Sequence, residues 1–475
     1  MKKILLPVAG DPTVSIAFSF ATGAQLDPPG KEGLAALTAA MLTEGATERF
    51  SYDEILERLY PLATEYDVTV DKELTTIDGR VHGDKLDEFV ELMLDAVLRP
   101  AFAADDFERL RGDAVNSIRS TLRFSSDEEL AKHALTATVF AGSRYAHPVE
   151  GLVTSLGAIT LDDVRSFYQE HFVQAKLTLA VAGSFDDALI TRLEQALGQL
   201  PEGKTAAPPA IASQTGKGRR VLLIDKPGAD SSVSIGTPVS VVRGERDFYA
   251  LWLANSWLGE HRHGASHLYQ VIREARGMNY GNYSYIEVFP DGGSLQMPPV
   301  NVPRRYQLFE VWLRTLPNEQ VVFAIRCALR EIDRLIEQGL TDEQFDLTRK
   351  FLTKYCAHYA PTTADRLGYA IDDAFYGIGG DGHLALFRKM MNELTLDEVN
   401  NAIRMHWQTE SLTIAIVTGD ADRLTRELTS NEPTPVEYAN PMPATILAED
   451  KEIAGYPLGI AAESIERLAI ATVFE

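Results

Sequence analysis

One short segment of the chain combines an arginine and a tyrosine, two side chains that can donate hydrogen bonds to an oxygen atom. It reads Ile-Arg-Glu-Ala-Arg-Gly-Met-Asn-Tyr and spans residues 272–280. The Arg273 guanidinium is a permanently charged, forked donor, and Tyr280 carries a hydroxyl on a rigid ring. Such a pair could hold a carbonyl oxygen or stabilise negative charge that develops on it. We expect the helix to end at Gly277 and the next strand to begin at Tyr280, so that both side chains line one cavity wall.

A cluster of histidines precedes this segment and has the composition of a metal site. Residues 260–267 contain Glu260, His261, His263 and His267. However, His261 and His263 precede a glycine, and no carboxylate or further histidine stands at ligand spacing. We therefore expect a loop over the cavity here rather than a metal site.

Two other motifs favour structural roles. Residues 377–382 are rich in glycine but lack the Lys-Ser/Thr pair and the preceding strand of a phosphate-binding loop, which predicts a helix–helix connector. His171 and His406 each precede an aromatic residue at equivalent positions of a repeat, so both are expected to be structural.

The chain repeats itself once, and the repeat organises the elements that must position these residues. Residues 160–164 (TLDDV) recur as 395–399 (TLDEV), residues 177–183 (LTLAVAG) as 412–419 (LTIAIVTG), and His171-Phe172 as His406-Trp407. All three pairs share one offset (395 − 160 = 235). A common offset indicates two homologous domains, which we place at residues 1–200 and 218–475. Residues 201–217 are rich in proline, glycine and small residues and are expected to be the linker.

Within the copies, strands mix with many helices without strict βαβ alternation. This pattern predicts an α+β fold of two tandem homologous domains, each a mainly antiparallel sheet packed with several helices. In the first copy we expect strands at 14–22, 66–70 and 74–81 and helices at 33–44, 52–59, 86–98, 105–122, 128–140 and 161–171. In the second copy we expect the same order, with long helices at 320–338 and 342–359.

Composition limits the classes of partner. The 475 residues carry a formal charge of −23, which disfavours nucleic acid and anionic membranes. No apolar run is long enough for a membrane-spanning helix, and two cysteines outside any CxxC pair make a disulfide framework or a cysteine zinc site unexpected. The apolar run at the N-terminus stops at Pro7, which predicts a cytoplasmic protein, or a periplasmic one whose export signal has been removed.

The helix expected at 33–44 has the frame of a metal site without its ligands. Two histidines four residues apart on one helix face can bind a single ion. The positions with that spacing hold Ala36 and Ala40, and Ala39 stands where a general base would be placed.

This helix resembles that of the insulinase/pitrilysin family, the inverted-zincin metallopeptidases. Their motif is His-x-x-Glu-His in a frame that this chain keeps at Gly33, Ala35, Met41 and Gly45-Ala46. The family's third ligand is a glutamate on a later helix, and Ser117 occupies that position here. Residues 145–151 match a further recurrent stretch of the family. The resemblance covers essentially the whole chain and implies the processing-peptidase/LuxS-like metallohydrolase fold.

The Arg/Tyr segment also resembles a family pattern, Ser-Arg-Leu…Arg-Glu-x-x-Gly-Leu-x-Tyr. Here Ser266-His267-Leu268 replaces the first part, with His267 in place of the usual arginine. The resemblance implies that Arg273 and Tyr280 contact the substrate main chain next to the scissile bond. It also implies no catalytic residue, zinc ligand or cofactor in this chain itself.

Together these resemblances predict the non-catalytic, substrate-gripping subunit of a heterodimeric zinc metallopeptidase. The partner would be a homologous His-x-x-Glu-His subunit that holds the zinc, and peptides would be degraded or processed in a closed chamber between the two chains. Two alternatives stay open: a scaffold or interaction protein of the same fold, as in respiratory complexes, and a peptide-binding module that acts alone.

Overall fold

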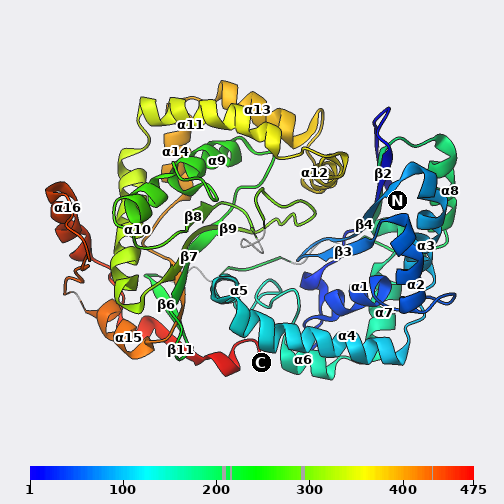
Figure 1. Cartoon of the computed structure of the whole chain (residues 1–475), viewed down its shortest axis with the longest axis horizontal. Coiled ribbons are helices and arrows are strands. Elements are labelled where there is room, and N and C mark those ends of the chain that lie inside the picture. The colour runs from blue at the N-terminus through cyan, green and yellow to red at the C-terminus, as the bar shows by residue number, and fades with distance from the viewer. Residues whose placement is uncertain (206–209, 214–216, 290–294, 431) are drawn as a thin grey trace.

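The computed structural model describes residues 1–205, 210–213, 217–289, 295–430 and 432–475. Two sheets form, one in each half of the sequence, and helices pack on both (Figure 1). No helix in the described ranges is long and apolar enough to cross a membrane.

The first sheet has five strands in the order β1-β5-β2-β4-β3. β1 runs parallel to β5, and the other neighbours are antiparallel. Alternation along β2 places Val14, Ile16 and Phe18 in the core beneath the helices of the first half, and Ala17 on the opposite face. The strands are β1 (Lys2–Pro7), β2 (Thr13–Phe20), β3 (Tyr66–Val70), β4 (Thr75–His82) and β5 (Leu177–Gly183).

The second sheet has six strands in the order β11-β6-β10-β7-β9-β8. Both neighbours of β6 are parallel to it, and the remaining pairs are antiparallel. The strands are β6 (Arg220–Asp225), β7 (Ser231–Val239), β8 (Asn282–Tyr285), β9 (Gln307–Leu316), β10 (Thr413–Thr418) and β11 (Ile465–Ala469).

Most helices pack on the sheet of their own half. The helices of the first half are α1 (Leu34–Thr43), α2 (Tyr52–Leu59), α3 (Leu86–Leu98), α4 (Ala104–Asn116), α5 (Asp127–Val139), α6 (Val153–Ala158), α7 (Leu161–His171) and α8 (Asp187–Leu197). Those of the second half are α9 (Arg246–Gly259), α10 (Val321–Gln338), α11 (Asp342–Tyr355), α12 (Thr363–Tyr376), α13 (Gly382–Glu393), α14 (Leu396–His406), α15 (Ala421–Thr429) and α16 (Ala444–Ala454).

The repeated Thr-Leu-Asp motif starts equivalent helices in the two halves. The hydroxyl oxygens of Thr160 before α7 and Thr395 before α14 each accept a bond from the backbone N–H three residues on, and the carboxylate of the acidic residue there accepts a bond from the threonine N–H. These reciprocal bonds satisfy donors that a helix start otherwise leaves free. The repeated motif therefore caps the equivalent helix in each half.

Two helices pack on the sheet of the other half. α5 packs on β7 and β10 of the second sheet, while α12 packs on β1, β2 and β5 of the first. Leu130, Leu135 and Val139 of α5 are buried against the second sheet, and Leu367 and Ile371 of α12 against the first. α5 and α12 are separated in sequence by nearly the repeat offset, so they are equivalent helices of the two copies. Each packs on the sheet of the other copy, and this reciprocal packing interlocks the two halves.

The predicted α+β class with mainly antiparallel sheets is confirmed, and helices 52–59, 86–98 and 161–171 have the predicted limits. The predicted helix 105–122 is wrong at its end, because α4 stops at Asn116 and residues 117–125 form a π-helical segment. The predicted helix 342–359 also ends early, at Tyr355. β1 was not predicted as a strand. The linker expected at 201–217 lies partly outside the described residues.

Candidate functional site

The four positions that would carry zinc chemistry lie on α1 and at the end of α4. α1 begins after Gly33, whose φ of 103° few side chains tolerate, and the Asp27 carboxylate accepts the N–H groups of Gly33 and Ala35, both at 2.7 Å. Ala36 and Ala40 are partly exposed on one face, as the i,i+4 spacing requires, whereas Ala39 is fully buried.

These residues do not fit a zinc ion. Ala36, Ala39 and Ala40 end in methyl groups, and Ser117, half-buried at the end of α4, contributes only a neutral hydroxyl. Zinc sites need thiolate, imidazole or carboxylate donors. In the part of the chain that the structure describes, no three His, Cys, Asp or Glu residues gather in a way that could hold a metal.

The structure brings Arg273 and Tyr280 together. Their segment joins α9 to β8, and the Arg273 guanidinium carbon lies 4.2 Å from the centroid of the Tyr280 ring. The Tyr280 side chain is 76% exposed, whereas Nε of Arg273 is buried without a hydrogen-bond partner among the described residues. The pair therefore presents an exposed phenol and a cation that no carboxylate in the described ranges binds, which suits it to bind a carbonyl or carboxylate group.

A neighbouring arginine holds this segment in place. Arg276 is buried and binds α16 through Asp450 at 2.8 Å and Glu449 at 2.7 Å. Residues 269–274 are π-helical rather than α-helical, and Gly277 has a φ of 68°. The expected strand start at Tyr280 is wrong, because β8 begins at Asn282.

The histidines of residues 260–267 each have a separate partner. His261 is buried, and its two ring nitrogens hydrogen-bond the Tyr285 hydroxyl and a backbone carbonyl. His263 packs against the Phe351 ring, and His267 forms a 2.6 Å ion pair with Glu331. The three rings therefore do not converge on a common point.

The two repeated histidines also have packing partners, consistent with the structural role expected for them. His171 hydrogen-bonds Lys176 at 2.6 Å and contacts Phe167, and His406 bonds Asp247 at 2.9 Å.

The turn between β3 and β4 forms a contact that the sequence interpretation missed. Its residues Asp71, Lys72 and Glu73 are buried, although the pattern marked them only as a turn between strands. Asp71 accepts two bonds from Arg304 of the second half, at 2.5 and 2.7 Å, and Glu73 binds Arg305. Charged residues are mostly exposed, so the residue types in this turn gave no signal that these three side chains are buried.

Family comparison is consistent with this architecture. Residues 3–151 match the family model described as Insulinase (Peptidase family M16), and residues 158–352 match the model described as Peptidase M16 inactive domain. The chain therefore belongs to the insulinase (M16) family.

Curated relatives include proteins with and without a peptidase designation. An uncharacterised zinc protease of Streptomyces coelicolor is 27% identical over 68% of this chain and 67% of its own length. The non-peptidase homolog YmxG of Helicobacter pylori is 25% identical over 85% of this chain and 88% of its length. The mitochondrial-processing peptidase subunit beta of Caenorhabditis elegans is 22% identical over 53% of this chain and 54% of its length. The chain thus spans only about half to two thirds of several relatives that it matches.

Solved structures share the fold. A peptidase M16 inactive domain from Pseudomonas fluorescens superposes with a TM-score of 0.75 at 22% identity, covering 87% of this chain and 94% of that one. A protease from Helicobacter pylori gives a TM-score of 0.74 at 14% identity, covering 88% and 96%.

Proposed function

We propose that this chain is the non-catalytic, substrate-gripping subunit of a heterodimeric zinc metallopeptidase that processes peptides. The partner is a homologous chain that carries His-x-x-Glu-His and holds the zinc. We also propose residues 1–200 and 218–475 as the two peptidase-like domains.

One observation carries the proposal: Arg273 and Tyr280 contact each other at the surface, while the metal positions of the same chain hold alanine and serine. If Arg273 and Tyr280 bind a peptide carbonyl, they contribute to peptide hydrolysis only where another chain supplies the metal-bound water. The name of the Caenorhabditis elegans relative, a subunit of a processing peptidase, supports a paired assembly.

In this assembly Arg273 would hold the peptide carbonyl next to the cleaved bond, and the Tyr280 hydroxyl would donate to the oxygen that becomes negatively charged. A single donor of this kind contributes about 10²–10³ to kcat in hydrolases where one was removed. Tyr280→Phe, which deletes only the hydroxyl, should therefore lower kcat more than it raises KM.

The test is reconstitution with a His-x-x-Glu-His homologue from the same genome. The mixture should cleave peptides, and Arg273→Ala or Tyr280→Phe should abolish most of the rate. Arg349→Ala is a matched control, because Arg349 also lies over an aromatic ring, that of Phe345, on α11. Tyr60→Phe, at an 87% exposed tyrosine, is the second control. Unchanged cleavage by the Arg273 and Tyr280 variants would overturn their assigned roles.

A second candidate is a scaffold or interaction protein with no proteolytic role. It is favoured by the similarity to the non-peptidase homolog of Helicobacter pylori, which extends over most of both chains. This alternative predicts that the chain forms a stable complex with a partner. Substitution of Arg273 would then change no peptide cleavage by that complex. Peptide binding by this chain alone would instead favour an independent peptide-binding module.

A further inference from the structure

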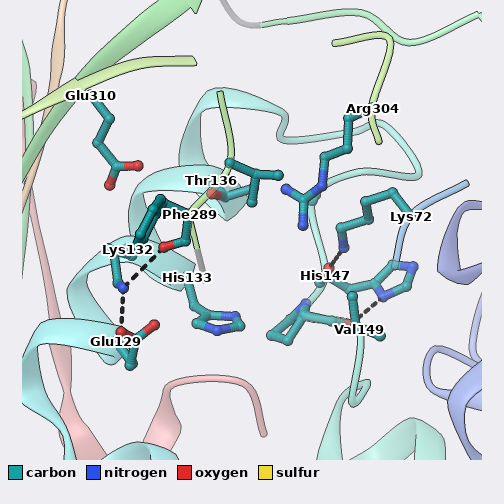
Figure 2. Close-up of a pocket in the computed structure, with 13 residues that line it drawn as sticks. Lys72, Glu129, Lys132, His133, Thr136, His147, Val149, Phe289, Arg304 and Glu310 are labelled. Carbon is teal, nitrogen blue, oxygen red and sulfur yellow. Dashed lines mark hydrogen bonds and ion pairs between the residues drawn. The ribbon is translucent and has the colours of Figure 1, made fainter. Parts of the chain in front are cut away.

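A cavity between the two halves has a lining that does not include α1, Arg273 or Tyr280. The first half contributes Lys72 from the β3–β4 turn, one face of α5 and residues 146–149. The second half contributes residues 288–289, Arg304 and Glu310, and Figure 2 shows these side chains around a common space. The cavity volume is about 60 Å³, which holds a few water molecules or a ligand of comparable size.

One wall of the cavity carries a positive charge that has no hydrogen-bonded counter-ion among the residues the structure describes. The Lys72 ammonium is buried and donates to the His147 carbonyl oxygen, which uses one of its three donors. Asp27, Asp71 and Glu150 act on Lys72 only through space. Beside it, Arg304 binds Asp71 through two of its nitrogens, and the third has no partner among the described residues.

Another part of the lining carries a buried carboxyl group that has no hydrogen-bonded cation among the described residues. Glu310 on β9 is 8% exposed, and its Oε1 is buried without a hydrogen-bond partner in the described chain. Figure 2 draws no interaction between Glu310 and Lys132, which instead binds Glu129 and lies over the Trp312 ring. Burial raises the pKa of Glu310 to about 7, as expected for a carboxyl group without a cation directly bound to it.

The other polar groups of the lining add no net charge. Lys132 and Glu129 compensate each other, and burial lowers the pKa of His133, so that its ring is neutral at pH 7. Thr136 adds a hydroxyl on the face of α5 that lines the cavity. One ammonium group and one carboxyl group, both buried and neither hydrogen-bonded to an ion of opposite charge among the described residues, therefore remain in this cavity, where a charge is costly unless a partner binds it.

We propose that this cavity binds a small zwitterion, an α-amino acid or a short peptide, with its carboxylate on Lys72 and Arg304 and its ammonium on Glu310. A neutral ligand would carry no charge opposite to that of either group, and a simple anion or cation would match only one. The proposal does not depend on a zinc-bearing partner, since both charged groups belong to this chain.

The test is isothermal titration of the full chain with L-alanine, the dipeptide Ala-Ala, acetate and ethylammonium. We expect saturable 1:1 binding of alanine or of the dipeptide, which identifies the ligand length, and at least tenfold weaker binding of acetate and ethylammonium. Equal affinity for acetate, or no saturable binding by any probe up to about 10 mM, would overturn the proposal.

Variants locate the site. Glu310→Gln keeps the side-chain shape and should weaken binding of the zwitterion by roughly tenfold or more, as should Lys72→Met. Glu57→Gln and Lys85→Met, at exposed positions, are the matched controls and should bind like the wild type. Should Lys72→Met fail to fold, Glu310→Gln decides the matter, and unchanged binding by Glu310→Gln refutes the assignment.

Discussion

The exchange of α5 between the halves predicts that one leucine is critical for stability. Leu135 is fully buried on α5 against the second sheet. Leu135→Ala should lower the free energy of unfolding by about 3 kcal/mol, within the range of 2–5 kcal/mol for buried leucines. Urea unfolding measures the change, and Leu447→Ala, at a leucine 45% exposed, should cost less than about 0.5 kcal/mol.

A second substitution tests whether α5 and β7 are in direct contact. A Cβ added at Gly236 of β7 would lie 2.9 Å from Cδ2 of Leu135 and 3.1 Å from the Phe309 carbonyl oxygen. Gly236→Ala alone should therefore cost about 1–3 kcal/mol. In the double variant, Leu135→Ala makes room for the methyl group that Gly236→Ala adds. The double variant should therefore lose about 1 kcal/mol less stability than the sum of the two single losses. Strict additivity, or a Leu135→Ala cost equal to that of the control, would refute the packing of α5 on the second sheet.

Three further predictions follow from particular residues. Ala39→Glu should destabilise the fold by several kcal/mol because that position is fully buried, whereas Ala36→Glu on the partly exposed face should cost less than about 1 kcal/mol; equal thermal shifts would contradict this. Arg304→Met leaves the buried Asp71 carboxylate without its partner and should cost about 3 kcal/mol in urea unfolding, and a loss below 1 kcal/mol would argue against the ion pair. Burial lowers the pKa of His147 to about 4 from 6.5, so its neutral form stabilises the fold above pH 6.5, and this contribution is lost as the pH falls towards 4. His147→Gln should therefore lose less stability than the wild type between pH 7 and 5, and parallel pH profiles would contradict the assignment.

The sequence allowed the repeat, the fold class and α1 to be predicted, because each leaves a local signal. Matching N-cap motifs start α7 and α14, and the spacing of Leu34, Leu37 and Met41 marks the buried face of α1. Such periodicity shows that a helix has an apolar face, but not which sheet covers that face. The packing of α5 and α12 on the opposite sheets could not be derived from it.

The candidate site was also only partly accessible to sequence reasoning. The spacing of Arg273 and Tyr280 suggested a shared wall, and the two side chains are in contact. The cavity near Lys72 depends on a residue from the β3–β4 turn and on Glu310 of β9, which lie far apart in the chain. Only the packing of the two halves brings these residues together, and no local pattern encodes it.

Division of labour between this chain and a zinc-bearing partner can be measured directly by a titration of peptide cleavage. A fixed amount of a His-x-x-Glu-His homologue is mixed with increasing amounts of this chain, and the initial rate of peptide hydrolysis is recorded. We predict negligible cleavage by either chain alone and a rate that saturates at one chain per partner. Arg273→Ala should lower the rate at least a hundredfold, while Arg349→Ala behaves as the wild type. A partner that cleaves equally well without this chain, or a mixture unaffected by Arg273→Ala, would contradict this division of labour.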